Sequence, residues 1–235
     1  MRDKELDEIK KYWDYRHSEK VGLAFATKEQ SDIWVSLISK YIKRNKLNQQ
    51  SLLDYGTWTG LVSLGLKEQL RIPKVVAADI SDEGIDKELL KKSGVHFIQA
   101  NQPKEVGGKY DIILCVSVFH HIAPKYVKQF MAQFSDMLSE NGILLIASFD
   151  KTDSIFMGKK KKLSALNMPV YATDIYSNKD YLKEIGLRSV ERGTRKHSLR
   201  KELLIVHNLV SNERVFRYGI FKSAKVTEKE QAKSW

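Results

Sequence analysis

Cysteine, proline and long apolar runs are all scarce in this chain of 235 residues. Its single cysteine, Cys115, excludes an internal disulfide and a zinc site built from cysteines. Four prolines and 13 glycines exclude a collagen-like or low-complexity chain. No apolar run is long enough to span a bilayer, and the first residues, Met-Arg-Asp-Lys-Glu, are charged where a signal peptide would be apolar. We therefore expect a soluble, cytoplasmic protein without a membrane span.

Acidic residues are too few to balance the basic ones, and the formal net charge is +11. Residues 151–235 alone carry 19 basic and 9 acidic side chains, a net charge of +10. Such an excess fits a solvated surface, and it also fits an anionic partner such as a nucleic acid or an anionic small molecule. The solvated surface is the simpler interpretation, so a nucleic-acid partner is not favoured. The oligomeric state is open.

From residue 51 onward, short apolar runs alternate with amphipathic stretches. The apolar runs predict strands, and the amphipathic stretches predict helices at 59–70, 82–92 and 126–138. The strands are near-continuous apolar runs, which is typical of a parallel sheet covered on both faces. Strand–helix alternation predicts a doubly wound, Rossmann-like α/β fold with helices on both faces. The five strands expected in this region are residues 51–55, 74–79, 95–99, 110–117 and 143–149.

Further elements flank this region on both sides. Helices are expected at about 3–17 and 29–45 before it, and Asn141-Gly142 should end the helix at 126–138. A helix at 178–185 and a strand pair at 187–193 and 203–210 follow, which completes a mostly parallel, seven-stranded sheet. We expect one domain with four parts: an N-terminal helical cap (1–48), a core (49–150), an insertion or lid with four consecutive lysines (151–177), and a helix, strand pair and basic tail (178–235).

The first strand leads into a glycine turn, Asp54-Tyr-Gly56-Thr-Trp58-Thr-Gly60. In doubly wound sheets ligands bind at the carboxyl ends of strands, so this turn is the first candidate site. It lacks the Gly-Lys-Ser/Thr of a phosphate loop. It also lacks the G-x-G-x-x-G of dinucleotide sites, because Trp58 and Leu61 occupy two of the glycine positions. Asp54 would repel a pyrophosphate, and it suits a cationic ligand.

Five segments in order resemble the motifs of class I S-adenosylmethionine-dependent methyltransferases, of the type that acts on small molecules. The glycine turn resembles the D-x-G-x-G-x-G motif, and Asp79 lies 23 residues after Gly56, near the spacing of the ribose-binding acid in such folds. The resemblance covers about residues 10–210 and implies S-adenosylmethionine as cofactor, a small-molecule acceptor and residues 49–150 as the cofactor-binding core. The five segments are residues 53–60, 76–81, 97–101, 110–121 and 138–146.

The resemblance also implies roles for individual residues of the core. Asp54 would hold the cofactor's ammonium, Gly56 and Gly60 would shape the turn, and Asp79 would accept from both ribose hydroxyls. The structural alternatives for the two acids are a helix cap or a loop acid. Their positions at the ends of strands favour the functional interpretation, most of all for Asp79.

Other candidate cofactor contacts lie outside the turn. Ile80 would pack on the adenine, and Asn101, where aspartate is usual, would pair with the adenine amine. Ser117 ends the fourth strand. Tyr12 and Arg16 belong to an aromatic N-terminal segment that would fold over the cofactor, with Arg16 at its carboxylate. The alternatives are a core isoleucine, a turn asparagine and an amphipathic helix docked on the sheet.

Catalysis would rest mainly on in-line placement of the acceptor, because the sulfonium is already activated. A base is needed only for a hydroxyl or protonated-amine acceptor, and His120 and His121 are its candidates, with Tyr12 and Tyr15 as further ones. Neither histidine has the partner four residues away that a helical zinc pair needs, so no metal is expected. The acceptor would lie under the N-terminal helix and the segment at 150–177.

Trp58 departs from the motif, which has glycine at this position. Because tryptophan disfavours a positive φ, either the turn keeps a β-region conformation with the indole pointing away, or the indole occupies part of the cofactor site. The second case would give a non-catalytic binding protein. The other rival function, methylation of RNA or protein, rests on the basic residues 151–235.

Overall fold

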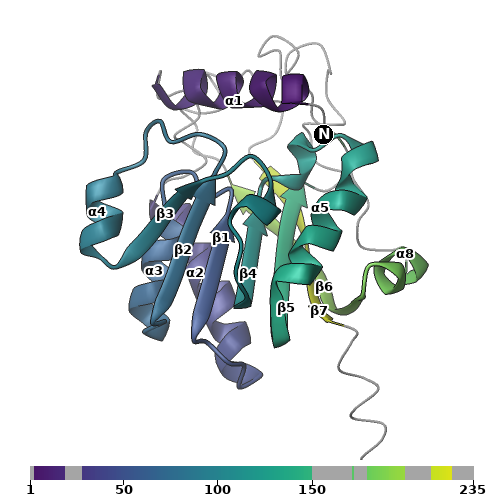
Figure 1. The fold of residues 1–235 in the computed structure, drawn as a ribbon. Coiled ribbons are helices and arrows are strands. Elements are labelled where there is room, and N and C mark those ends of the chain that lie inside the picture. Colours follow the sequence, from purple (N-terminus) through teal and green to yellow (C-terminus); the bar gives the residue numbers. More distant parts are fainter. Residues whose placement is uncertain (1–2, 19–27, 150–170, 172–178, 199–212, 224–235) are drawn as a thin grey trace, which may run out of the picture.

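The computed structural model describes residues 3–18, 28–149, 171, 179–198 and 213–223 (Figure 1). Within these ranges no helix is both long enough and apolar enough to cross a membrane. The strands are β1 Ser51–Tyr55, β2 Lys74–Asp79, β3 Val95–Gln99, β4 Tyr110–Val116, β5 Leu138–Phe149, β6 Leu187–Ser198 and β7 Glu213–Ser223. The α-helices are α1 Asp3–Ser18, α2 Lys28–Arg44, α3 Leu61–Leu70, α4 Lys87–Lys92, α5 Pro124–Met137 and α8 Lys179–Glu184.

The strands form one seven-stranded sheet in the order β3-β2-β1-β4-β5-β7-β6. Strands β1 to β5 pair in parallel, whereas β7 runs antiparallel between β5 and β6. The predicted mostly parallel, doubly wound sheet with a cap is therefore confirmed. Because the chain order reverses next to β1, the loops after β1 and β4 meet at a topological switch point, where ligands bind in such folds.

Alternate residues of each strand point to opposite faces, and each face carries its own apolar core. Leu53 of β1 packs in one core with Phe130 and Phe134 of α5. Leu52, its neighbour, packs in the other core with Ile38 of α2. Helices on both faces explain why the strands read as continuous apolar runs.

Helix α1 lies across the carboxyl ends of the strands, whereas α2 lies beside α3 behind the sheet (Figure 1). Trp34, Ile38 and Ile42 of α2 are buried in the core of that face. The predicted cap at 1–48 therefore joins two helices with different roles. We propose that only residues 3–18 cap the sheet and that α2 belongs to the core layer.

Several element boundaries differ from prediction. Helix α5 ends at Met137, one residue from the predicted end, but Asn141-Gly142 is not its stop, because β5 already starts at Leu138 rather than at residue 143. A register shift against β4 accommodates the extra residues, and a Cβ on Gly142 would lie 2.8 Å from the Tyr110 carbonyl oxygen. Helix α4 starts only at Lys87, because the Asp86 carboxylate caps it by accepting from the Leu89 N–H.

The last strand is also placed differently. The expected strand at 203–210 lies outside the described residues, and the strand that pairs with β6 is Glu213–Ser223. Strand β6 runs on to Ser198, beyond the predicted end at residue 193. The expected insertion or lid at 151–177, with the lysines at 159–162, also lies outside them except for Tyr171.

Candidate functional site

The glycine turn after β1 is tied to the neighbouring strand by its backbone. The N–H groups of Gly56 and Thr57 both donate to the Ala78 carbonyl oxygen, at 2.7 and 3.1 Å. Gly56 and Gly60 have φ values of 76° and 77°, in the left-handed region that glycine adopts freely. The two motif glycines therefore shape the turn, and their contact with a cofactor stays a prediction.

Trp58 also adopts the left-handed region, with a φ of 52°. The β-region alternative is therefore wrong, and tryptophan stands here in a backbone conformation that glycine adopts freely. This backbone costs a residue with a Cβ roughly 1–2 kcal/mol. Two contacts hold it: the Trp58 N–H donates to Asp79 Oδ2 at 2.8 Å, and the indole lies 6.1 Å from the Trp13 ring, centroid to centroid.

This strain predicts the sign of a comparison between two variants. Trp58→Gly and Trp58→Ala both remove the indole, but only the alanine keeps the strained φ. We expect the glycine variant to have the larger free energy of unfolding, by about 1 kcal/mol, in urea denaturation. If the turn were β-region, glycine would be the less stable of the two, because it loses more chain entropy on folding.

Asp54 lies in the turn's interior and is 3% exposed. Its Oδ2 accepts from the hydroxyls of Thr57, at 2.8 Å, and Ser63, at 2.6 Å. Burial raises the pKa of Asp54, and these two hydroxyls oppose the rise. Asp54 thus belongs to β1, and its carboxylate ties that strand to the turn and to α3. Its contact with a cofactor ammonium stays a prediction.

Asp79 ends β2 beside the turn and is 7% exposed. Its Oδ2 accepts from the Trp58 N–H and its Oδ1 from the Ser81 N–H, at 3.2 Å. Burial raises the pKa of Asp79 to about 6, although hydrogen bonds from the backbone N–H groups of Trp58, Ser81 and Ile80 lower it. The nearby Asp54 charge adds to the rise in pKa. A carboxylate has about four acceptor positions, so acceptor capacity remains for a hydroxyl donor such as one of a ribose.

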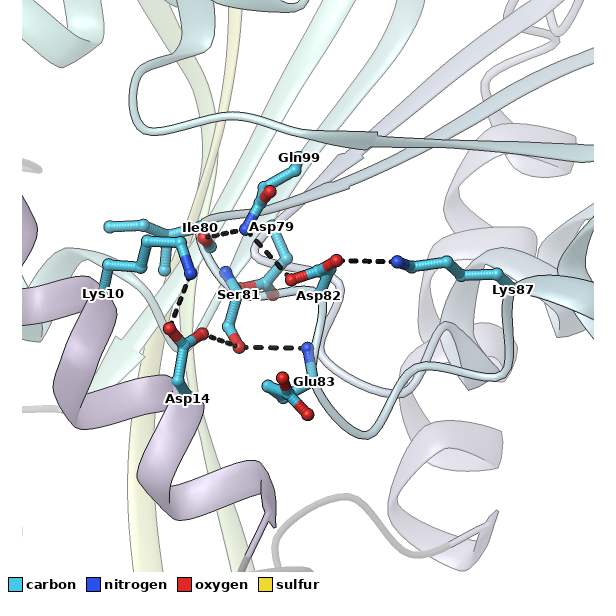
Figure 2. Close-up of polar contacts among 9 residues, drawn as sticks. All are labelled: Lys10, Asp14, Asp79, Ile80, Ser81, Asp82, Glu83, Lys87 and Gln99. Atoms are coloured by element: carbon cyan, nitrogen blue, oxygen red, sulfur yellow. Dashed lines mark hydrogen bonds and ion pairs between the residues drawn. The ribbon is translucent and has the colours of Figure 1, made fainter.

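Helix α1 is anchored through Ser81, two residues after this acid (Figure 2). The Ser81 hydroxyl, which is fully buried, donates to Asp14 Oδ1 at 2.6 Å. The other oxygen of Asp14 forms an ion pair with Lys10 of the same helix at 2.6 Å. Ile80, the residue after Asp79, is half-buried. Its packing on an adenine stays a prediction.

A second contact of α1 is aromatic. The Trp13 ring lies between Trp58 of the turn, at 6.1 Å, and His121 of the loop after β4, at 5.0 Å. Tyr12 packs edge-on against Trp13 at 5.3 Å. We call Tyr12, Trp13, Trp58 and His121 the aromatic cluster. It brings together three segments that the sequence keeps far apart.

Arg16 is buried on α1, only 6% exposed. Its guanidinium donates to the Tyr12 hydroxyl at 3.0 Å. Burial raises the pKa of Tyr12, and the Arg16 charge opposes the rise. The helix thus holds both predicted residues at the carboxyl ends of the strands, and their contact with a cofactor stays a prediction.

The two candidate histidines differ in access. His120 is 2% exposed, and its Nδ1 lies 3.2 Å from the Ser148 hydroxyl of β5. His121 is only partly buried and faces the aromatic cluster, with the two imidazole centroids 4.1 Å apart. His121 is therefore the more accessible of the two, and a catalytic role for either histidine stays a prediction.

The remaining candidates follow β3 and β4, which are separated in the sheet by β2 and β1. Asn101 is exposed, and its backbone N–H donates to Glu105 Oε2 at 2.8 Å, as the turn alternative predicts. Ser117 has a φ of 63° and donates its N–H to the Ala147 carbonyl oxygen at 2.7 Å. Strained backbone of this kind recurs at functional sites. No group of three His, Cys, Asp or Glu side chains suited to a metal ion occurs within the described ranges.

Sequence reasoning missed Asp14, Ser81 and Ser148. Ser81 follows Asp79 by two residues, and Asp14 lies within the aromatic N-terminal segment, so both were close to named candidates. Nothing in the sequence pairs them with each other. Ser148 had no signal, because a serine in an apolar strand is ordinary.

Comparisons with known proteins agree with this geometry. A family model described as a methyltransferase domain matches residues 22–198, whereas a search of curated proteins found no match. Magnesium protoporphyrin IX methyltransferase from Synechocystis, with bound SAH, is similar in structure at a TM-score of 0.68 and 14% identity, over 93% of this chain and 100% of that one.

Two further solved structures are similar. An S-adenosylmethionine-dependent methyltransferase from Clostridium acetobutylicum has a TM-score of 0.59 and 14% identity, over 81% of this chain and 90% of that chain. Coclaurine N-methyltransferase, bound to N-methylheliamine and SAH, has a TM-score of 0.55 and 14% identity, over 80% of this chain and 72% of that chain. Because the family model covers most of the chain, the protein belongs to the methyltransferase-domain family, with the class I, Rossmann-like fold of the S-adenosylmethionine-dependent enzymes.

Proposed function

We propose that the protein binds S-adenosylmethionine between the glycine turn and α1 and transfers its methyl group to a small-molecule acceptor. The observation that carries this proposal is the Asp79 carboxylate, which is fixed by two N–H groups at the end of β2 beside the turn. A carboxylate so placed suits the two hydroxyls of a ribose. The cofactor's methionine arm would then extend past the turn toward the loop after β4.

The protein's own chemical contribution is placement. The sulfonium of the cofactor is the activated methyl donor, and the acceptor atom must lie in line with its methyl group. Helix α1 lies over the strand ends and supplies a cover that excludes water from this region (Figure 1). Trp13 and Trp58 add apolar surface to that cover.

His121 is the proposed base for an acceptor that must lose a proton. It lies in the loop after β4 against Trp13, and it is partly accessible. His120, a buried ring near the Ser148 hydroxyl, would help to position His121. Two similar structures, named for a porphyrin and an alkaloid substrate, support a small-molecule acceptor.

Calorimetric titration with S-adenosylhomocysteine tests the cofactor site directly. We expect one site per chain, and we expect ligand to change the tryptophan fluorescence of the parent but not of Trp58→Phe. ATP is the matched control ligand, because it shares the adenosine and carries phosphates that the Asp54 and Asp79 carboxylates repel. A parent that binds neither S-adenosylmethionine nor S-adenosylhomocysteine would instead support the non-catalytic binding protein.

Methylation of RNA or protein stays the alternative for the acceptor. It rests on the net charge of +10 over residues 151–235, much of which lies outside the described ranges. A complex with a generic RNA that weakens steeply as salt is raised would support it.

A further inference from the structure

One carboxylate organises two of the places at which α1 contacts the core. Asp79 accepts from the N–H of Trp58, whose indole packs against Trp13. It also accepts from the N–H of Ser81, whose hydroxyl donates to Asp14. Trp13 and Asp14 are consecutive residues of α1, so both contacts lie within one turn of the helix.

We propose that Ser81 is a positioning residue that couples the Asp79 carboxylate to the docking of α1 over the site. The inference rests on the proposed function, in which this carboxylate binds the ribose of S-adenosylmethionine. Ser81 does this with two donors at once: its backbone N–H holds Asp79 Oδ1 and its hydroxyl holds Asp14 Oδ1 (Figure 2).

The contact between Ser81 and Asp14 is a strong hydrogen bond from a buried hydroxyl to a carboxylate. The Ser81 side chain is fully buried, and its hydroxyl lies 2.6 Å from a charged acceptor, which makes the hydrogen bond stronger than a neutral one. Lys10 balances the Asp14 charge from the same helix at 2.6 Å. The charge of Asp14 is therefore balanced within α1, and the core contributes only the Ser81 hydroxyl to this contact.

Coupling follows from the shared acceptor. Ligand hydroxyls that bind Asp79 fix the carboxylate, and through its two N–H donors they fix the backbone of Trp58 and Ser81. Those two residues present the surfaces on which Trp13 and Asp14 dock. Linkage is reciprocal, so a docked helix must strengthen ribose binding by the factor by which ribose strengthens docking.

Other charged groups near Asp79 offer a matched control. Asp82 follows in the same loop, but it pairs with Lys87 at 2.7 Å and accepts from Gln99 at 3.2 Å (Figure 2). Its link to α1 is the charge of Lys10, and no hydrogen bond among the described residues joins the two. Glu83 donates its N–H to the Ser81 hydroxyl oxygen, and its side chain is exposed. Asp54 faces Asp79 from the turn, and its Oδ2 is engaged by Thr57 and Ser63. Asp82→Asn therefore changes the charge of the loop without changing the docking contact.

Hydrogen exchange of the α1 amides measures docking in the whole chain, without and with saturating S-adenosylhomocysteine. In the ligand-free protein, Ser81→Ala and Asp79→Asn should each raise exchange around Trp13 and Asp14 about fivefold or more, and Asp82→Asn should not. Asp79→Asn should raise exchange because an amide keeps only one of the two acceptor oxygens of the carboxylate. Asp14→Asn, which keeps an acceptor oxygen, should exchange more slowly than Asp14→Ala.

The ligand arm separates this inference from the proposed function. In the parent, S-adenosylhomocysteine should slow α1 exchange, and Ser81→Ala should weaken binding about fivefold or more. A parent that binds no S-adenosylhomocysteine refutes the proposed function, whereas the ligand-free comparison still decides whether Asp79 controls docking. If Ser81→Ala and Asp79→Asn exchange like Asp82→Asn, or if ligand binds Ser81→Ala as tightly as the parent, the coupling is refuted.

Discussion

Replacing Asp79 by alanine should weaken binding of S-adenosylhomocysteine by about 1–3 kcal/mol, roughly 5- to 150-fold in Kd. The variant removes the proposed acceptor for two ribose hydroxyls and leaves the N–H groups of Trp58 and Ser81 without their carboxylate. The site is only 7% exposed at Asp79, so water replaces these bonds poorly. Calorimetric titration of parent and variant at the same pH measures the difference.

Asp82→Ala is the control for this prediction, because it removes a neighbouring acid that is paired with Lys87. It should bind the ligand as the parent does. Equal affinities of the parent and Asp79→Ala would show that the ribose contact has been assigned to the wrong residue.

The raised pKa of Asp79, about 6, adds a pH dependence with opposite signs for binding and stability. Ligand binding should weaken as pH falls through about 6, because the protonated acid has lost acceptor capacity. A folded-state pKa above the ordinary value of 3.8 stabilises the fold below pH 4, and this stabilisation is lost as pH rises through 6. Asp79→Asn should flatten both profiles.

Gly56→Ala should lower the free energy of unfolding by about 2–5 kcal/mol, the largest stability loss that we expect of a single methyl group here. Two costs add. The φ of 76° is strained for any residue with a Cβ, and that Cβ would lie 2.1 Å from Val118 Cγ2. Because Gly56 opens the turn and Val118 follows β4, the clash would push apart the two loops that form the site. Urea denaturation measures the loss.

Two further variants separate these costs. Gly107 has a φ of 67°, and no atom lies within 4 Å of a Cβ built on it, so Gly107→Ala carries the backbone cost alone, about 1–2 kcal/mol. Adding Val118→Ala to Gly56→Ala removes the clashing methyl group and should recover part of the loss. A Gly56→Ala variant no less stable than Gly107→Ala would mean that the turn and Val118 are not packed as described.

Strands covered on both faces were the most predictable part of the fold. The expected bounds of β1 and β2 match the structure residue for residue, because every residue of these two strands after the first is buried. The start of β5 was missed, since Asn141-Gly142 reads locally as a helix stop and only the register against β4 makes it part of a strand. Pairing partners far along the chain decide such boundaries.

The candidate site also has features that the sequence predicts and features that it does not. The glycine turn and Asp79 were predictable, because each directly follows an apolar strand. The positive φ of Trp58 was not, because it depends on a hydrogen bond to Asp79, 21 residues away. The contact between Asp14 and Ser81 spans 67 residues and leaves no local pattern in the sequence.

The place of β7 sets an order of events while the chain is being made. It lies between β5 and β6, yet it follows both in the sequence. Until Glu213–Ser223 has left the ribosome, β5 presents an unpaired edge and β6 lacks the neighbour with which it pairs. Unpaired edges recruit strands from other chains. Nascent chains of this protein are therefore most exposed to aggregation in the interval between the emergence of β5 and that of β7.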